Sequence, residues 1–150
     1  MPSIIPSYVY TLFAMIAVGA LLVVAFTFST ENLRNQAETQ QLQRIAEYVA
    51  AKGCELVSAS KANVIYTNLT LDLPILVGNK PYWIQLENDS SSAWVEAGFG
   101  DVPLGTGQLV TIPLEVSASG TFMSQYGIPV LQCNVTNGNV FLELSGGYFI

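Results

Sequence analysis

The sequence contains no histidine, only two cysteines, and only five lysine and arginine residues in 150. Without histidine the chain lacks the commonest general base, the commonest zinc ligand and the usual Ser-His-Asp triad. Eleven acidic residues give a net charge of −6, so there is no basic patch that would neutralise the phosphates of a nucleic acid. We therefore expect no nucleic-acid partner, no histidine-based metal centre and no histidine-dependent enzyme.

Other residues do not supply the missing chemistry. Glu87 and Asp89 lie two residues apart beside a serine-rich segment, a pattern more typical of a solvated loop than of an acid/base pair or a calcium site. The glycines of GFGDVPLGTG are followed by neither a Walker lysine nor a dinucleotide fingerprint, so they indicate turns. We expect no catalytic residue, no cofactor and no metal site, and we predict that the chain is not an enzyme.

Charge is also absent from the start of the chain, where the first charged residue is Glu31. The run Tyr8–Phe28 would form a helix of roughly 31 Å, the hydrocarbon thickness of a bilayer. Eleven of its residues are Val, Leu, Ile or Phe, which favour membrane insertion by roughly 5 kcal/mol in total. The alternative is a cleaved secretory signal, but residues 1–7 lack the positive charge that such a signal carries. We expect a retained membrane-spanning helix.

The helix is predicted to continue well beyond the apolar run. Pro6 suits the first turn of a helix, and no proline follows before Pro74. Residues 35–43 are polar on nearly all sides, which suits a helix that crosses a solvated gap or a neighbour's polar surface. We expect the helix to end near Lys52 or Val57. An apolar stripe at helical spacing, expected to pack on the downstream domain, consists of Leu42, Ile45, Ala46, Val49 and Ala50.

From residue 63 onward, the sequence alternates between apolar and polar residues as strands do. Strands are predicted at residues 63–74, 82–86, 93–100, 108–115, 120–126, 130–136 and 139–144. The last two form a hairpin, because Asn137-Gly138 suits a type I′ turn. We predict an α+β fold, with a long N-terminal hydrophobic α-helix followed by an antiparallel β-sandwich-like domain or a strongly curved sheet. The expected organisation is a hydrophobic helix (1–30), its amphipathic continuation (31–60) and a β-domain (61–150).

Two features place the β-domain outside the cytoplasm, although Arg34 and Arg44 after the span weakly favour the opposite orientation. The glycosylation pattern Asn-x-Ser/Thr begins at three positions, Asn68, Asn88 and Asn134. Cys54 and Cys133 are predicted to form a disulfide, which would close a loop of about 80 residues and contribute about 4.5 kcal/mol by chain-entropy theory. The alternative is a pair of unrelated buried thiols.

The three aromatic residues Tyr82, Trp83 and Trp94 could form a carbohydrate-binding surface. Aromatic side chains on strands are more often part of the core, so we predict that these residues are buried.

This arrangement of an uncharged apolar helix, an amphipathic continuation and one β-domain with glycosylation patterns resembles archaeal type IV pilins and archaellum-type filament subunits. The resemblance covers the layout of the whole chain. It implies that the hydrophobic helices bundle as a filament core and that the β-domains form an outer sheath. It also implies a homopolymer on the cell surface, inserted in the cytoplasmic membrane before assembly, with cell adhesion, motility and DNA exchange as alternative roles. The residues expected in the bundle are Leu12, Ile16, Gly19, Leu21, Val24 and Phe28.

Two further functions stay open. The chain could be a single-pass membrane protein whose extracellular β-domain acts as an envelope or filament accessory factor. A secreted carbohydrate-binding or hydrolytic domain would need an accessible aromatic platform or a carboxylate pair.

Overall fold

A computed structural model describes residues 5–60, 66–89, 91–103, 107–113, 116–136 and 138–147. Helix α1 (Ile5–Ser60) is followed by seven β-strands, as predicted for an α+β protein. Contacts divide the chain into two compact units, Met1–Ala37 and Glu38–Ile150, so α1 contributes to both. Because their relative placement is not fixed, each unit is described separately.

Helix α1 contains 56 residues and ends three residues beyond the predicted limit at Val57. Its interior contains no proline after the first turn, which leaves the ladder of backbone hydrogen bonds intact. Near its end, the hydroxyls of Ser58 and Ser60 donate to the carbonyls of Cys54 and Leu56, each at 2.8 Å. These bonds satisfy the serine hydroxyls locally, so the serines are compatible with the last turns of the helix.

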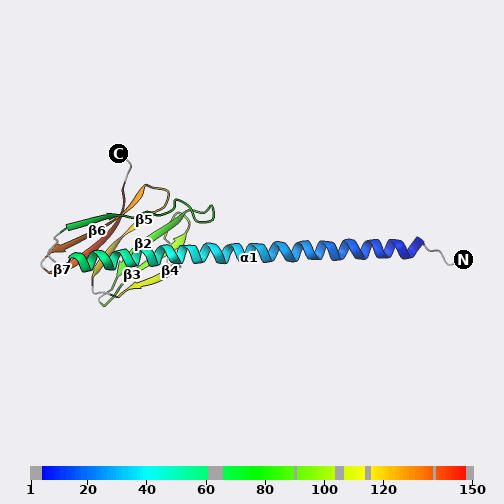
Figure 1. The fold of residues 1–150 in the computed structure, drawn as a ribbon, viewed down its shortest axis with the longest axis horizontal. Helices are drawn as coiled ribbons and strands as arrows, with labels where there is room; N and C mark the ends of the chain where they lie inside the picture. Colours follow the sequence, from blue (N-terminus) through cyan, green and yellow to red (C-terminus); the bar gives the residue numbers. More distant parts are fainter. Residues whose placement is uncertain are drawn as a thin grey trace. The chain divides into compact units, whose positions relative to one another are not determined.

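The seven strands form one sheet in the order β1-β6-β7-β5-β2-β3-β4 (Figure 1). Every neighbouring pair is antiparallel except β5 and β7, which run parallel. The strands are β1 (Tyr66–Thr70), β2 (Tyr82–Asn88), β3 (Ala93–Phe99), β4 (Gln108–Ile112), β5 (Ser117–Met123), β6 (Ile128–Thr136) and β7 (Asn139–Gly147).

Strand β5 joins the two halves of the sheet by changing its partners along its length. Ser117–Ser119 pair with β7, whereas on β2 the pairing runs from Gly120 to Met123. Gly120 has φ +117°, and a Cβ at this position would overlap the carbonyl oxygen of Leu144. A residue without a side chain is therefore required at this point. Because β5 connects both halves, the strands form one sheet and not the two packed sheets of a sandwich.

The second layer over the sheet is supplied by the last part of α1, which lies across the strands in Figure 1. Every residue of the predicted apolar stripe is buried in the core that α1 shares with the strands, and Leu56 and Val57 extend it. This stripe covers one face of the sheet, so no second sheet is needed to complete the core. Its five predicted members are Leu42, Ile45, Ala46, Val49 and Ala50.

The prediction that residues 35–43 cross a solvated gap is wrong for part of that segment. Glu38 is only 4% exposed, and its Oε2 lies 2.6 Å from Nζ of Lys80. Lys80 belongs to the loop before β2. In the same loop, Gly78 packs directly against the Glu38 side chain. Glu38 and Lys80 are 42 positions apart in the sequence, and nothing in their local sequence patterns indicates that they pair.

Most strand predictions are confirmed. Strands β6 and β7 form the predicted hairpin, with Thr136 opposite Asn139 and a positive φ of 80° at Gly138. Residues 63–65, 114, 115 and 137, which the predictions included, lie outside the described residues. Tyr82 and Trp83 are buried as predicted, whereas Trp94 is half-buried.

Candidate assembly surface on the first half of the helix

All side chains from residue 8 to residue 37 of α1 are exposed. The large apolar ones include Leu12 (59%), Leu21 (70%) and Phe28 (64%). Burying apolar surface is worth about 25 cal/mol per Å², so this helix surface would be strongly unfavourable in water. None of the described residues covers this surface.

The six predicted bundle residues do not lie on one side of the helix. At about 100° per residue, Leu12, Ile16 and Gly19 fall on one side. Leu21, Val24 and Phe28 fall roughly opposite, and all six are exposed. The apolar surface therefore surrounds the helix, an arrangement typical of a membrane span or the centre of a bundle. A helix at the surface of a soluble domain would instead carry a single stripe.

Polar side chains near the end of the apolar run bond within the helix. The hydroxyl of Thr27 donates to the carbonyl of Val23 at 2.9 Å, and that of Thr30 donates to Phe26 at 2.8 Å. An internally satisfied hydroxyl can be moved from water into lipid or protein at little cost. The apolar surroundings can therefore extend to Thr30, directly before Glu31, the first charged residue of the chain.

A shallow hollow of about 420 Å³ lies on one side of this helix. A Cβ added at Gly19 would meet nothing within 4 Å, so the isolated chain does not require glycine there. A glycine in a helix interior costs about 1 kcal/mol relative to alanine. The residues that line the hollow are Thr11, Ala14, Met15, Val18, Gly19 and Leu22.

The helix is long and apolar enough to cross a membrane, with a mean hydropathy of 2.5 over its most apolar part. None of that part is buried within the chain. By length and composition, this part of the helix is therefore a candidate membrane span.

The three glycosylation patterns differ in their surroundings. Asn68 and Asn134 are exposed on β1 and β6. Asn88, at the end of β2, accepts a hydrogen bond from the backbone N–H of Ala118 and donates to the carbonyl of Asp89, both at 3.2 Å. Ser90, the third residue of its pattern, lies outside the described residues. Of the three asparagine amides, that of Asn88 is therefore held by the fold.

The predicted disulfide is not formed, because Cys54 and Cys133 are both free thiols. The Sγ of Cys133 accepts a hydrogen bond from Ser60 Oγ at 3.0 Å, in a fully buried site. Cys54 precedes Ser60 by six residues, about 9 Å along the helix axis, so Cys133 faces a different turn of α1. Burial raises the pKa of the Cys54 thiol above its usual value, which keeps it in the less reactive protonated form.

The acidic pair that the sequence assigned to a loop bonds within its own segment. Glu87 accepts from the amide of Gln85 at 2.8 Å. Asp89 Oδ1 accepts from the backbone N–H groups of Ser91 and Ser92, both at 2.7 Å. These backbone bonds, that of Ser91 first, hold the pKa of Asp89 below its usual value. Within the described part of the chain, no three His, Cys, Asp or Glu side chains gather as a metal site would require.

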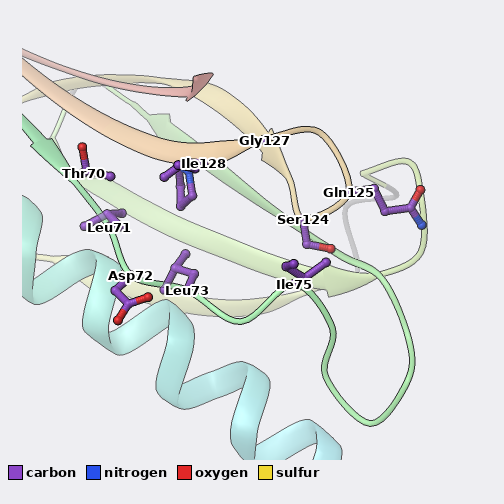
Figure 2. Close-up of a pocket in the computed structure, with 10 residues that line it drawn as sticks. Thr70, Leu71, Asp72, Leu73, Ile75, Ser124, Gln125, Gly127 and Ile128 are labelled. Atoms are coloured by element: carbon purple, nitrogen blue, oxygen red, sulfur yellow. The ribbon is translucent and has the colours of Figure 1, made fainter. Parts of the chain in front are cut away.

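A second hollow, of about 380 Å³, lies between the segment that follows β1 and the turn between β5 and β6 (Figure 2). Leu71, Leu73 and Ile128 contribute apolar side chains to it, and Asp72 is its acidic group. No local sequence pattern predicts this hollow, because its two walls come from residues 70–75 and 124–129, which are far apart along the chain. It contains no histidine or cysteine that could perform chemistry.

Comparison of the chain with protein-family models, curated proteins and solved structures finds no match.

Proposed function

We propose that this chain is the structural subunit of an extracellular filament of the type IV pilus kind. The observation that carries the proposal is the contrast within α1. Residues 8–28 are apolar on all sides and exposed, whereas the stripe from Leu42 to Val57 is buried by the chain's own sheet. The first half of the helix therefore offers the surface through which identical subunits polymerise, with the β-domain outside.

The free energy of this assembly depends on its surroundings. In a membrane, an apolar helix gains little by exchanging lipid for another apolar helix, so association there depends on close packing at small residues such as Ala14 and Gly19. Outside the membrane, the same surface would meet water unless neighbouring helices covered it, at about 25 cal/mol per Å². Subunits would thus be held without covalent bonds, through head-to-tail contacts repeated along a helical polymer.

A single-pass anchor is the second candidate, because the length of the apolar run matches the hydrocarbon thickness of a bilayer. In both cases the helix is inserted in the cytoplasmic membrane first. The two candidates differ in whether the helix later leaves the lipid for a bundle of identical helices. Neither candidate assigns a catalytic residue, a cofactor or a nucleic-acid partner to the chain.

The test is electron microscopy of material sheared from cells that express the chain, with mass spectrometry of the purified fraction. We expect thin filaments that contain this chain. Leu21→Asp should abolish them, because a carboxylate would be buried in the bundle without a partner.

The matched control is Leu109→Asp, since Leu109 on β4 is exposed to nearly the same degree as Leu21, 66% against 70%. It should leave the filament yield close to that of the original chain. Wild-type chain found only in detergent extracts of membranes, with no filaments, would overturn the proposal in favour of the anchor. Unchanged filaments in Leu21→Asp would also contradict it.

A further inference from the structure

Two exposed aromatic residues flank Asn134 on the face of the sheet that points away from α1. In the register of the strands, Asn134 on β6 lies opposite Tyr66 on β1 and opposite Phe141 on β7. Tyr66 is 55% exposed and Phe141 is 43% exposed. The three residues form one row across three adjacent strands, called the Asn134 row below.

All members of the Asn134 row point to the same side of the sheet. On β6 and β7 the neighbouring residues Cys133 and Leu142 are buried and therefore point to the other face. On β1, Thr67 follows Tyr66 and lies opposite Cys133, so Tyr66 points to the same face as Asn134. Residues directly opposite each other on antiparallel strands have Cβ atoms about 5 Å apart. The Cβ atoms of Tyr66 and Phe141 therefore lie about 10 Å apart, with the Asn134 side chain between them.

The next row on this face contains no aromatic residue. Asn68 lies opposite Gln132, which in turn lies opposite Glu143. Tyr66 and Phe141 are not part of the buried core on the other face, so the core does not explain them. Of the three glycosylation patterns, only that of Asn134 has an exposed aromatic residue directly opposite it on each neighbouring strand.

We propose that Asn134 carries an N-linked glycan whose first sugar lies between Tyr66 and Phe141. The apolar C–H face of a sugar ring packs well on an aromatic ring, and two rings at this spacing can hold a sugar from both sides. This inference rests on the proposed function, since it requires the β-domain to lie outside the cytoplasm.

The modification is a transfer from a sugar activated on a lipid phosphate. The N–C bond forms between Nδ2 of Asn134 and the anomeric carbon, and the bond from that carbon to the phosphate oxygen breaks. The phosphate leaves with the electron pair, and the amide nitrogen loses a proton. Asn88 is a poorer acceptor, because its amide already donates to Asp89 and accepts from Ala118.

The experiment uses the full chain, purified in detergent from cells with and without the glycan-transferring enzyme. Glycopeptide mass spectrometry measures occupancy at the three asparagines, and thermal unfolding measures the Tm. We expect occupancy at Asn134 and a higher Tm for the glycosylated chain. The double variant Tyr66→Ala, Phe141→Ala should lose most of that rise in Tm, with its unglycosylated form as the baseline.

Two variants serve as controls. Tyr126→Ala removes an aromatic side chain that is 61% exposed but lies in the turn after β5, so the rise in Tm should persist. Asn68→Gln should also preserve it, whereas Asn134→Gln should abolish it. A glycan on Asn68 or Asn88 with Asn134 bare would overturn the inference, and so would a rise in Tm that is unaffected by removing both aromatic residues.

Electron microscopy of the same cells separates this inference from the proposed function. Filaments with Asn134 bare would overturn the inference alone. A glycan on Asn134 without filaments would overturn the filament and leave the inference standing. Absence of both would overturn both.

Discussion

The two halves of α1 are similar in secondary structure and opposite in their surroundings. From residue 8 to residue 37 every side chain is exposed, although most of them up to Phe28 are apolar. From Glu38 onward the apolar stripe from Leu42 to Val57 is buried against the sheet, and even the carboxylate of Glu38 is covered. Within the described residues, the chain thus buries the apolar stripe of one half of the helix and leaves the apolar side chains of the other half exposed.

This difference shows that hydrophobicity alone does not indicate where a folded chain buries its surface. The more apolar half of the helix is the uncovered one, whereas the half richer in Gln, Glu and Ala contributes to the core. The distribution of apolar residues around the helix explains the contrast. A stripe fits a sheet on one side, but an apolar surface on all sides needs neighbours all round.

The largest difference between the two halves is expected when one leucine in each is replaced by alanine. Leu42→Ala should destabilise the β-domain by about 2–5 kcal/mol, because Leu42 is only 2% exposed and its loss leaves a cavity. Leu22→Ala should leave that stability nearly unchanged, because Leu22 is 54% exposed. Urea unfolding of the detergent-solubilised chain, followed by tryptophan fluorescence, measures both. Equal destabilisation by the two variants would show that the halves do not differ as described.

A smaller effect is expected at Tyr82, which belongs to the same core cluster as the second half of the helix. Its hydroxyl donates to the carbonyl of Pro74 at 2.6 Å, and burial raises the pKa of Tyr82 to about 12. Tyr82→Phe should therefore cost about 1 kcal/mol near neutral pH.

The raised pKa of Tyr82 also predicts how that cost changes with pH. The unfolded chain ionises this phenol near its usual value of 10.0, whereas the folded chain keeps it neutral up to about 12. Its contribution to stability is fully present below pH 10 and is lost as the pH rises towards 12. Urea unfolding at about pH 8 and about pH 11.5 measures the free energy of unfolding of Tyr82→Phe and of the original chain. The stability advantage of the original chain should be smaller at the higher pH. A gap that does not change with pH would contradict this prediction.

The smallest effect is expected from a matched pair of glycines. Gly19→Ala should not alter the β-domain, because no atom lies within 4 Å of the added Cβ. Gly53→Ala places a Cβ 3.0 Å from Cδ2 of Leu142, so the gain in helix propensity is offset by a shift of that leucine. We expect a net change below about 1 kcal/mol for Gly53→Ala.

The same pair sharpens the comparison when filament yield is measured. If helices pack closely at Gly19, the added methyl group should reduce the yield for Gly19→Ala while Gly53→Ala retains it. The reverse order would place the close contact in the second half of the helix.

By itself, the sequence determined the features that depend on neighbouring residues. The lack of proline between Pro6 and Pro74 and the helical spacing from Leu42 to Ala50 predicted one long helix and its buried stripe. Alternation predicted the strands, and Asn137-Gly138 predicted the hairpin. The all-round apolar run from Tyr8 to Phe28 predicted the candidate assembly surface. Each of these signals is local, because helices and strands repeat over two to four residues.

Only the tertiary structure decided which distant residues meet. It placed β5 between β7 and β2, made that sheet single, and gave the sheet the helix as its second layer. It placed Cys133 against Ser60, so that Cys133 and Cys54 form no disulfide. It also brought Tyr66, Asn134 and Phe141 into one row. Such contacts depend on strand register and on the path of the chain, which the pattern along any one segment does not specify.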